Sequence, residues 1–333
     1  LRSMQVQAWE EEPLFDVGRH DIVAANAYLG ARPIADALAL GADVVVTGRV
    51  TDSALALAPL LHHFGWDDSD WDRVAAGVLT GHLLECGAQA TGGYFADPGY
   101  KDVPDMADIG YPIAEVTGAG DIVLTKPSGT GGRVDPRTVK EQILYEIHDP
   151  ANYLTPDVTL DLMQVAVSDA GPDRVQVTGA KGRPAPETLK VTISYEGGWL
   201  GEGEISYAGP GASARARLAV ETAKARVERE FPGLAVRTDV LGLVSVLDGD
   251  SGGLSKHHSD IDWQDVRVRL AVNADDETTA ARAAREVETL YCAGPAGGAG
   301  VRLNVMPRIK TASCLIPRES IQPRVRLVGP ADA

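Results

Sequence analysis

The chain has few cysteines and no long hydrophobic run. Its three cysteines, Cys86, Cys292 and Cys314, are too sparse for a disulfide framework, and they favour a reducing compartment. No apolar stretch approaches the roughly 20 residues that a helix needs to span a bilayer. The N-terminus lacks the charged-then-apolar order of a signal peptide. These absences predict a cytoplasmic protein with no membrane partner.

Positive charge is scarce as well. The 31 Lys and Arg side chains are outnumbered by 47 Asp and Glu side chains, which gives a net charge of −16. Nucleic-acid-binding proteins usually carry a basic stripe that neutralises phosphates, and the sequence shows no such stripe. The charge balance therefore argues against nucleic acid as a partner, and it disfavours an anionic membrane surface.

The hydrophobic pattern divides the chain into two parts. A length of 333 residues is too great for one ordinary core, so two domains are expected. The pattern predicts a strand at 21–27, a helix at 32–40 and a buried strand at 43–47, with the two strands parallel across a right-handed crossover. It also predicts helices at 48–64, 70–86 and 135–146, and short strands near 113–116 and 122–124.

The second part has the pattern of an antiparallel sheet covered by helices. It predicts helices at 213–231 and 275–291, among strands at 161–167, 174–179, 188–195, 201–205, 236–247, 265–272 and 301–305. The predicted fold class is therefore α/β followed by α+β. A parallel-sheet α/β domain at 1–155 precedes a second domain at 156–333, which has an antiparallel sheet and helices.

The segment 81–100, GHLLECGAQATGGYFADPGY, is the most informative one. Its five glycines allow the backbone to come close to a ligand, because glycine has no Cβ and tolerates positive φ. His82 and Glu85 are three residues apart and share one face of the expected helix. A general acid/base pair is one interpretation, since imidazole titrates near neutral pH. A metal site and a purely structural hydrogen bond are the alternatives.

A second candidate site lies at 48–53, GRVTDS, between a predicted strand and a predicted helix. Open α/β folds bind ligands at such strand ends, and the N–H groups of a helix N-terminus favour an anion there. The guanidinium of Arg49 can fork onto a carboxylate or phosphate. Alternatively, Asp52 or Ser53 caps the helix and Arg49 pairs with a neighbouring side chain.

The third candidate site is the glycine-rich turn KPSGTGGR at 126–133. Its backbone N–H groups can curl into an anion-binding nest, with a cation at each end. The turn is not a P-loop, because the pattern GxxxxGKS/T is missing and Lys126 precedes the glycines. A carboxylate or a phosphate-bearing thioester fits this turn as well as a nucleotide does, and a plain tight hairpin is the alternative.

Two nucleophile patterns carry less weight. The string GDSGG at 249–253 matches the G-x-S-x-G elbow of hydrolases, with Ser251 as the nucleophile. It lies in the α+β part, however, and has no suitably spaced histidine. Cys86 would need a neighbour that lowers the pKa of its thiol. A hydrolase that uses Ser251 or Cys86 is therefore an alternative function.

A family resemblance is carried by the segments ANAYLGARPIADALALGADVVVTGRVTD, AAGVLTGHLLECGAQATGGYFADPGYKDVPD, GYPIAEV, KPSGTGG, TVKEQILYEIHDPANYLTPDV and GEGEISYAGPGA. In these segments the chain resembles the acyclic terpene utilisation (AtuA-type) family. The resemblance implies a catabolic role for branched acids and acyclic terpenoids such as citronellol and geraniol, through acyl-CoA intermediates. It also implies a further α/β segment ahead of the point where this chain starts, and a small partner domain or subunit. We therefore expect the family's usual N-terminal segment, with any site residues it supplies, to be lacking here.

Three functions are consistent with these residues. The first is a lyase or hydratase that acts on a branched or terpenoid-derived carboxylate or its acyl-CoA thioester. Its catalytic candidates are His82, Glu85, Tyr94 and Glu115. Its substrate-binding candidates are Arg49, Asp52, Ser53, Gln89, Gly92, Gly93, Lys126, Ser128, Gly129, Thr130, Gly131 and Gly132. The second function is a non-catalytic subunit whose glycine-rich loops bind a small partner protein, and the third is the hydrolase.

No cofactor is assigned from the sequence. No G-x-G-x-x-G follows a predicted strand, which argues against NAD, and no attachment sequence for biotin or phosphopantetheine is visible. The sequence does not decide whether a divalent metal is a cofactor or whether an acyl-CoA is the substrate. A homo-oligomer is expected, because the loops of 87–135 are long for an isolated surface.

Overall fold

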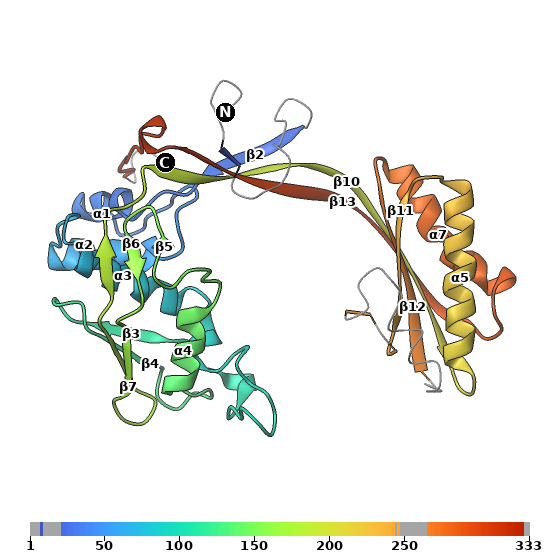
Figure 1. Cartoon of the computed structure of the whole chain (residues 1–333), viewed down its shortest axis with the longest axis horizontal. Helices are drawn as coiled ribbons and strands as arrows, with labels where there is room; N and C mark the ends of the chain where they lie inside the picture. The colour runs from blue at the N-terminus through green and yellow to red at the C-terminus, as the bar shows by residue number, and fades with distance from the viewer. Residues whose placement is uncertain (1–6, 9–20, 244, 247–264, 330–333) are drawn as a thin grey trace. The chain divides into compact units, whose positions relative to one another are not determined.

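The computed structural model describes residues 7–8, 21–243, 245–246 and 265–329 (Figure 1). Two compact units divide the chain. The first unit comprises Leu1–Phe15, Ala25–Thr192 and Ser313–Ala333, and the second comprises Asp16–Ala24 and Ile193–Ala312. Each unit joins segments that are far apart in the sequence.

The described residues of the first unit form four α-helices. They are α1 (Arg32–Ala39), α2 (Ala54–Phe64), α3 (Trp71–Leu84) and α4 (Pro136–Leu144). Asp135 caps α4, because its carboxylate accepts hydrogen bonds from the backbone N–H groups of Arg137 and Thr138. Gly81 lets α3 lie against the start of α2, since a Cβ there would be 2.5 Å from the Cα of Ser53. Capping by Asp135 thus fixes where α4 begins, and the close packing at Gly81 fixes the start of α2 against α3.

Two small antiparallel sheets complete the first unit. The larger has the order β3-β4-β8-β7, with β3 (Ile113–Val116), β4 (Ile122–Thr125), β8 (Val175–Thr178) and β7 (Ala166–Asp169). The smaller has β5 (Tyr153–Leu154), β6 (Thr159–Asp161) and β9 (Lys181–Arg183). Ile122, Leu124 and Leu160 of these sheets share one buried cluster with Leu57 and Leu79 of the helices. One hydrophobic core therefore holds α2, α3 and both sheets together.

In its described residues, the second unit is a sheet with two helices. Its elements follow the order β10 (Thr188–Ala208), α5 (Ala212–Glu230), β11 (Ala235–Leu241), β12 (Asp265–Ala274), α7 (Glu277–Ala293) and β13 (Ala299–Pro317). The strands pair in the order β13-β10-β12-β11. Figure 1 shows α5 and α7 on the same face of this sheet. This β-α-β-β-α-β order is that of the ferredoxin-like motif.

Alternating side chains explain how this sheet packs. Along β12, Val266, Val268 and Leu270 are buried, whereas the residues between them are half-buried. β10 has glycine where α7 crosses it, and a Cβ at Gly203 would clash with the carbonyl oxygen of Ala284. The glycine at this position is therefore required by the close approach of helix and strand.

The mixed α/β class is confirmed, and most predicted helices and strands lie within a few residues of those observed. Two strands are much longer than predicted. The strands expected at 188–195 and 201–205 form the single 21-residue strand β10. The strand expected at 301–305 is the 19-residue strand β13. Each is extended by pairing with a distant strand, which local sequence does not reveal.

The parallel strand predicted at 43–47 is not formed. β2 (Ile22–Ala27) pairs with β10 instead, and the nearest parallel contact is an isolated bridge between Leu29 and Val50. Val44 and Val46 are 80% and 91% exposed. An apolar run of this kind is typical of a strand buried on both faces. No described strand pairs with it, so Val44 and Val46 face solvent, whereas Val45 packs against the core.

Candidate functional site

The C-terminal end of α3 carries the His82–Glu85 pair. His82 is 1% exposed, and its Nδ1 lies 2.9 Å from Oε1 of Glu85. Its Nε2 lies 3.2 Å from the carbonyl oxygen of Ile143. The backbone carbonyl of His82 accepts a hydrogen bond of 2.8 Å from Nε2 of Gln142. The i, i+3 spacing thus brings the two side chains together, and α4 holds the imidazole from another direction.

Both ring nitrogens of His82 face oxygen atoms of Glu85 and Ile143. The imidazole N–H can donate to Glu85 or to Ile143, depending on the tautomer. The Glu85 side chain is 15% exposed, whereas His82 is buried. In this arrangement Glu85 is the group that can meet a substrate, and His82 positions it.

Further polar side chains gather around this pair. Gln142 lies near the end of α4, Tyr145 and Glu146 directly follow that helix, and Tyr153 is in β5. The Tyr153 ring lies 5.8 Å from the His82 ring, centroid to centroid. We call the set the helix-end cluster, and its members are His82, Glu85, Cys86, Gln142, Tyr145, Glu146 and Tyr153.

Nearby carboxylates give the surroundings of the helix-end cluster a negative charge. Burial raises the pKa of Tyr153 to about 12, and the charges of Glu85, Asp52 and Glu146 add to this effect. A hydrogen bond to Glu146, together with the charge of that carboxylate, raises the pKa of Tyr145. Both phenols therefore stay protonated at neutral pH, and each can donate a hydrogen bond or a proton.

Cys86 is a poor nucleophile in this environment. Burial raises the pKa of its thiol, against a hydrogen bond from Gln142 that lowers it. The charges of Glu85, Glu146 and Asp52 raise that pKa further. Because the thiolate is the reactive form, this setting disfavours a hydrolase that uses Cys86. The other proposed nucleophile, in the segment 249–253, lies outside the described residues.

Alkylation of the native protein tests the reactivity of Cys86. At neutral pH, iodoacetamide is expected to modify the exposed Cys292 about tenfold or more faster than Cys86, because little Cys86 thiolate is present. Mass spectrometry of digested samples measures each rate. In concentrated urea all three cysteines, including the buried Cys314, should react alike. Rapid labelling of Cys86 in the folded protein would restore the thiol hydrolase as a candidate.

Arg49, Asp52 and Ser53 lie at the start of α2. Nη2 of Arg49 is 3.2 Å from Oδ2 of Asp52, and its guanidinium carbon is 4.4 Å from the centroid of the Tyr28 ring. Ser53 is the N-cap residue, but its side chain makes no capping hydrogen bond, and its buried Oγ has no partner. The charge of Asp52 contributes to the raised pKa of Tyr153, so this group acts electrostatically on the helix-end cluster.

Arg49 also lines a groove of about 1020 Å³ in the first unit. We call it the valine groove. Its apolar lining includes Leu29, Pro33, Leu40, Val44, Val45, Val46, Val50, Val325, Leu327 and Val328, and its cations are Arg49, Arg324 and Arg326. Small-molecule sites commonly have volumes of roughly 300–1,000 Å³, with apolar walls and a few polar groups that orient the ligand. The groove therefore has the size and lining of a site for an apolar chain with an anionic end.

Lys126, the first of the two cations of the turn at 126–133, is held by protein partners. Nζ of Lys126 donates to the carbonyl oxygen of Thr130 at 2.8 Å, and it pairs with Oδ2 of Asp173 at 3.3 Å. The Lys126 side chain is only 6% exposed. Its charge therefore stabilises the turn itself in this structure.

The glycines of the same turn are packed against neighbouring backbone. The N–H groups of Gly131 and Gly132 donate hydrogen bonds to backbone carbonyls, and a Cβ at Gly131 would clash with the carbonyl oxygen of Asp105. Ser128 and Gly129 are the exposed part of the turn. Close packing therefore accounts for the two buried glycines, and it leaves few free N–H groups for an anion.

The remaining candidates of the segment 81–100 lie in and after the 3₁₀ helix η1 (Gly87–Thr91), and they are Gln89, Gly92, Gly93 and Tyr94. Tyr94 is 89% exposed, with a φ of 56° that is rare for a residue with a Cβ. Its ring lies 6.4 Å from the Tyr145 ring, which places it beside the helix-end cluster. Gly92 packs closely, since a Cβ there would lie 2.7 Å from Cγ1 of Val103.

Glu115, in β3, forms a surface ion pair. Its Oε2 lies 2.5 Å from Nη2 of Arg174, and hydrogen bonding from that guanidinium lowers the pKa of Glu115. The carboxylate thus pairs with Arg174 rather than with the helix-end cluster. Its low pKa makes it a weak proton acceptor near neutral pH.

Metal ligands were one interpretation of His82 and Glu85. Within the described residues, no group of three or more His, Cys, Asp or Glu side chains is placed to hold a metal ion. No helix in that same part of the chain is both long and apolar enough to cross a membrane.

Sequence reasoning did not single out Gln142, Tyr145, Glu146 or Tyr153. Polar residues near the end of an amphipathic helix are ordinarily solvated. The pattern of the segment EQILYEIHDPANY therefore did not predict a functional site. Packing of α4 against α3 is what brings these side chains to the His82–Glu85 pair. Local sequence does not specify where two helices pack against each other.

These features define a two-unit protein of mixed α/β class whose candidate site lies in the first unit. The profile of the family described as "Acyclic terpene utilisation family protein AtuA" matches residues 2–327 of the 333. The chain therefore belongs to the acyclic terpene utilisation family, which gives it a catabolic role in acyclic terpene utilisation. No curated protein and no solved structure matches the chain.

Proposed function

We propose that the protein is a lyase or hydratase that acts on a branched or terpenoid-derived carboxylate or its acyl-CoA thioester. The observation that carries this proposal is the valine groove, where an apolar wall and the guanidinium of Arg49 line one space. A branched hydrocarbon chain would cover Val44 and Val46, and burying apolar surface contributes roughly 25 cal/mol per Å². Arg49 would hold the carboxylate or the thioester oxygen.

Glu85 is the proposed base of the reaction. In the dehydrating direction, Glu85 takes a proton from the carbon beside the carbonyl, and the hydroxyl on the next carbon departs. The phenol of Tyr145 or Tyr94 protonates that hydroxyl, so that water leaves and a C=C bond forms. Hydration is the reverse of these steps. Negative charge gathers on the carbonyl oxygen during proton removal, and Arg49 would stabilise it there.

Ligand binding to the valine groove is the direct test. A thermal-shift screen with branched carboxylates and their CoA thioesters is expected to give one clear stabilisation, since a ligand at 100 times its dissociation constant contributes about 2.7 kcal/mol. Arg49→Ala should abolish the shift, because Arg49 is the one of the three groove cations that is proposed to hold the carboxylate or thioester oxygen. Arg73→Ala is the matched control, since Arg73 is a similarly exposed arginine that pairs with Asp70 on α3 and does not line the groove.

The outcome also separates the two main functions. A shift that Arg49→Ala removes and Arg73→Ala retains supports the enzyme. Cooperative melting with no shift for any compound would instead favour the non-catalytic subunit. A shift that survives Arg49→Ala would place the ligand elsewhere in the protein.

A further inference from the structure

The outer edge of β13 in the second unit is an open strand edge as far as the described residues go. β13 pairs with β10 on one side, and Figure 1 shows the two strands running side by side. On the other side, β1 (Gln7–Ala8) pairs only with Cys314 and Leu315. Among the residues that the structure describes, 299–312 thus has no ladder partner on that side. At a rise of roughly 3.3 Å per residue, this β13 edge is about 45 Å long.

Exposed apolar side chains accompany the β13 edge. Leu303, Met306 and Ile309 are 40%, 41% and 55% exposed. Proteins usually protect a strand edge with a short strand, a proline or a lysine. Pro307 and Lys310 are residues of that kind, but they leave the three apolar side chains in solvent. An edge that combines free backbone groups with apolar side chains is suited to accept an added strand.

The charge of β13 shows which strand would fit. Ala299–Pro317 contains the cations Arg302, Arg308 and Lys310 and no Asp or Glu, in a chain of net charge −16. These three side chains have no ion-pair partner among the described residues. Two β13 edges paired with each other would bring like charges together, which destabilises cross-strand pairs. A second copy is therefore a poor occupant, and an acidic strand is a good one.

We propose that the β13 edge binds an extended, acidic segment of a partner protein by strand addition. Backbone N–H and C=O groups of the edge would continue the ladder onto the partner strand. Leu303 and Ile309 lie on one face of β13 and would contact partner residues on that face. Met306 lies on the opposite face with the three cations, which would pair with carboxylates of the partner. This inference does not depend on the proposed enzymatic activity.

A labelled peptide of alternating Glu and Val residues is the probe, and fluorescence anisotropy with the full chain measures its binding. Charge reversal of the three cations (R302E, R308E and K310E together) is expected to weaken binding about tenfold or more, a loss of about 1.4 kcal/mol. Added salt should weaken binding as well. Arg285→Glu is the matched control, because Arg285 lies on α7, is 71% exposed and should leave binding unchanged.

Three results would overturn the proposal. The first is no binding of the Glu–Val peptide to a wild-type chain that melts cooperatively. The second is equal binding of a Lys–Val peptide, which would show that charge does not select the partner. The third is a wild-type dimer in sedimentation that Ile309→Lys dissociates, which would make a second copy the occupant. Circular dichroism of each variant confirms that a change in binding is not a loss of fold.

Discussion

Replacing Glu85 with Gln is expected to lower turnover of the acid or thioester by about 10²–10⁴-fold, the range for losing a general base. The amide keeps the shape of the side chain and can still hydrogen-bond to Nδ1 of His82, which lies 2.9 Å from Oε1. The free energy of unfolding should therefore change by no more than about 1–1.5 kcal/mol. Steady-state kinetics and urea unfolding measure the two effects separately.

His82→Ala provides the contrast, because its main effect is expected on stability. The substitution leaves a cavity beside Tyr153 and removes the donor that faces Glu85 and Ile143. Leaving a buried hydrogen-bonding group without its partner costs about 1–3 kcal/mol, and the cavity adds to that cost. A Glu85→Gln variant that folds normally and keeps full turnover would show that Glu85 is not the base. A similar loss of stability in both variants would mean that the pair is structural.

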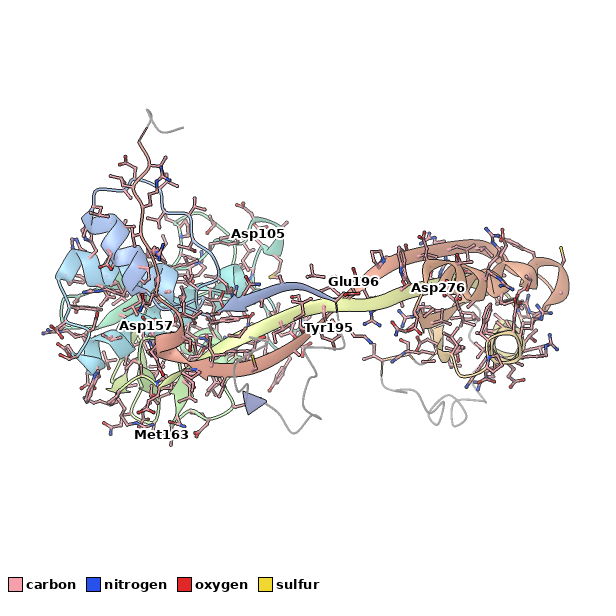
Figure 2. All side chains as sticks on the ribbon, turned by 90° about the horizontal axis from the view of Figure 1, so that it is seen from above. Asp105, Asp157, Met163, Tyr195, Glu196 and Asp276 are labelled. Atoms are coloured by element: carbon pink, nitrogen blue, oxygen red, sulfur yellow. The ribbon has the colours of Figure 1, made fainter. Side chains whose placement is uncertain are left out.

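Asp157→Asn is expected to flatten the pH dependence of stability. Oδ1 of Asp157 accepts a hydrogen bond of 2.8 Å from the backbone N–H of Ala31, at the start of α1. Its Oδ2 is buried and has no partner, and a Cβ at Gly30 would clash with this carboxylate. Figure 2 labels Asp157 among the side chains of the first unit. Burial raises its pKa from the ordinary 3.8 to about 6.

The sign of this effect follows from the raised pKa of Asp157. The folded state binds the proton more tightly than the unfolded state, so stability falls as pH rises from 3.8 through about 6. The total loss is up to about 3 kcal/mol, at 1.36 kcal/mol per pKa unit. This loss of stability is complete once the pH is above the folded-state pKa of about 6. An asparagine cannot ionise, so the variant should lose this part of the slope.

Urea unfolding near pH 4 and near pH 7.5 measures the slope for Asp157. The comparison uses the change between the two pH values, so a constant cost of the amide cancels. Asp36→Asn is the matched control, since Asp36 is 55% exposed and pairs with Arg32 at the surface. Equal slopes in the wild type and in Asp157→Asn would contradict the assignment of a high pKa to this carboxyl.

Much of the fold could be predicted because the signals are local. The helices α3, α5 and α7 are long, and a 3.6-residue apolar period identifies such helices well. The strand at 43–47 shows the limit of this reasoning. Its valines have the composition of a buried strand, but composition does not say which strand will pair with it. The pairing of β2 with β10 joins segments about 170 residues apart, which no local window contains.

The candidate site divides in the same way. The sequence by itself determined that His82 and Glu85 meet, because helical geometry places residues i and i+3 on one face. It also determined the family, through long matching segments. Only the tertiary structure decided that Gln142 and Ile143 hold the imidazole, since they lie about 60 residues away on another helix. It also decided that Arg49 lines an apolar groove and that residues 299–312 of β13 have no described strand on their outer side. Contacts between distant segments depend on how whole elements pack, and that packing is a property of the assembled core rather than of any short stretch of chain.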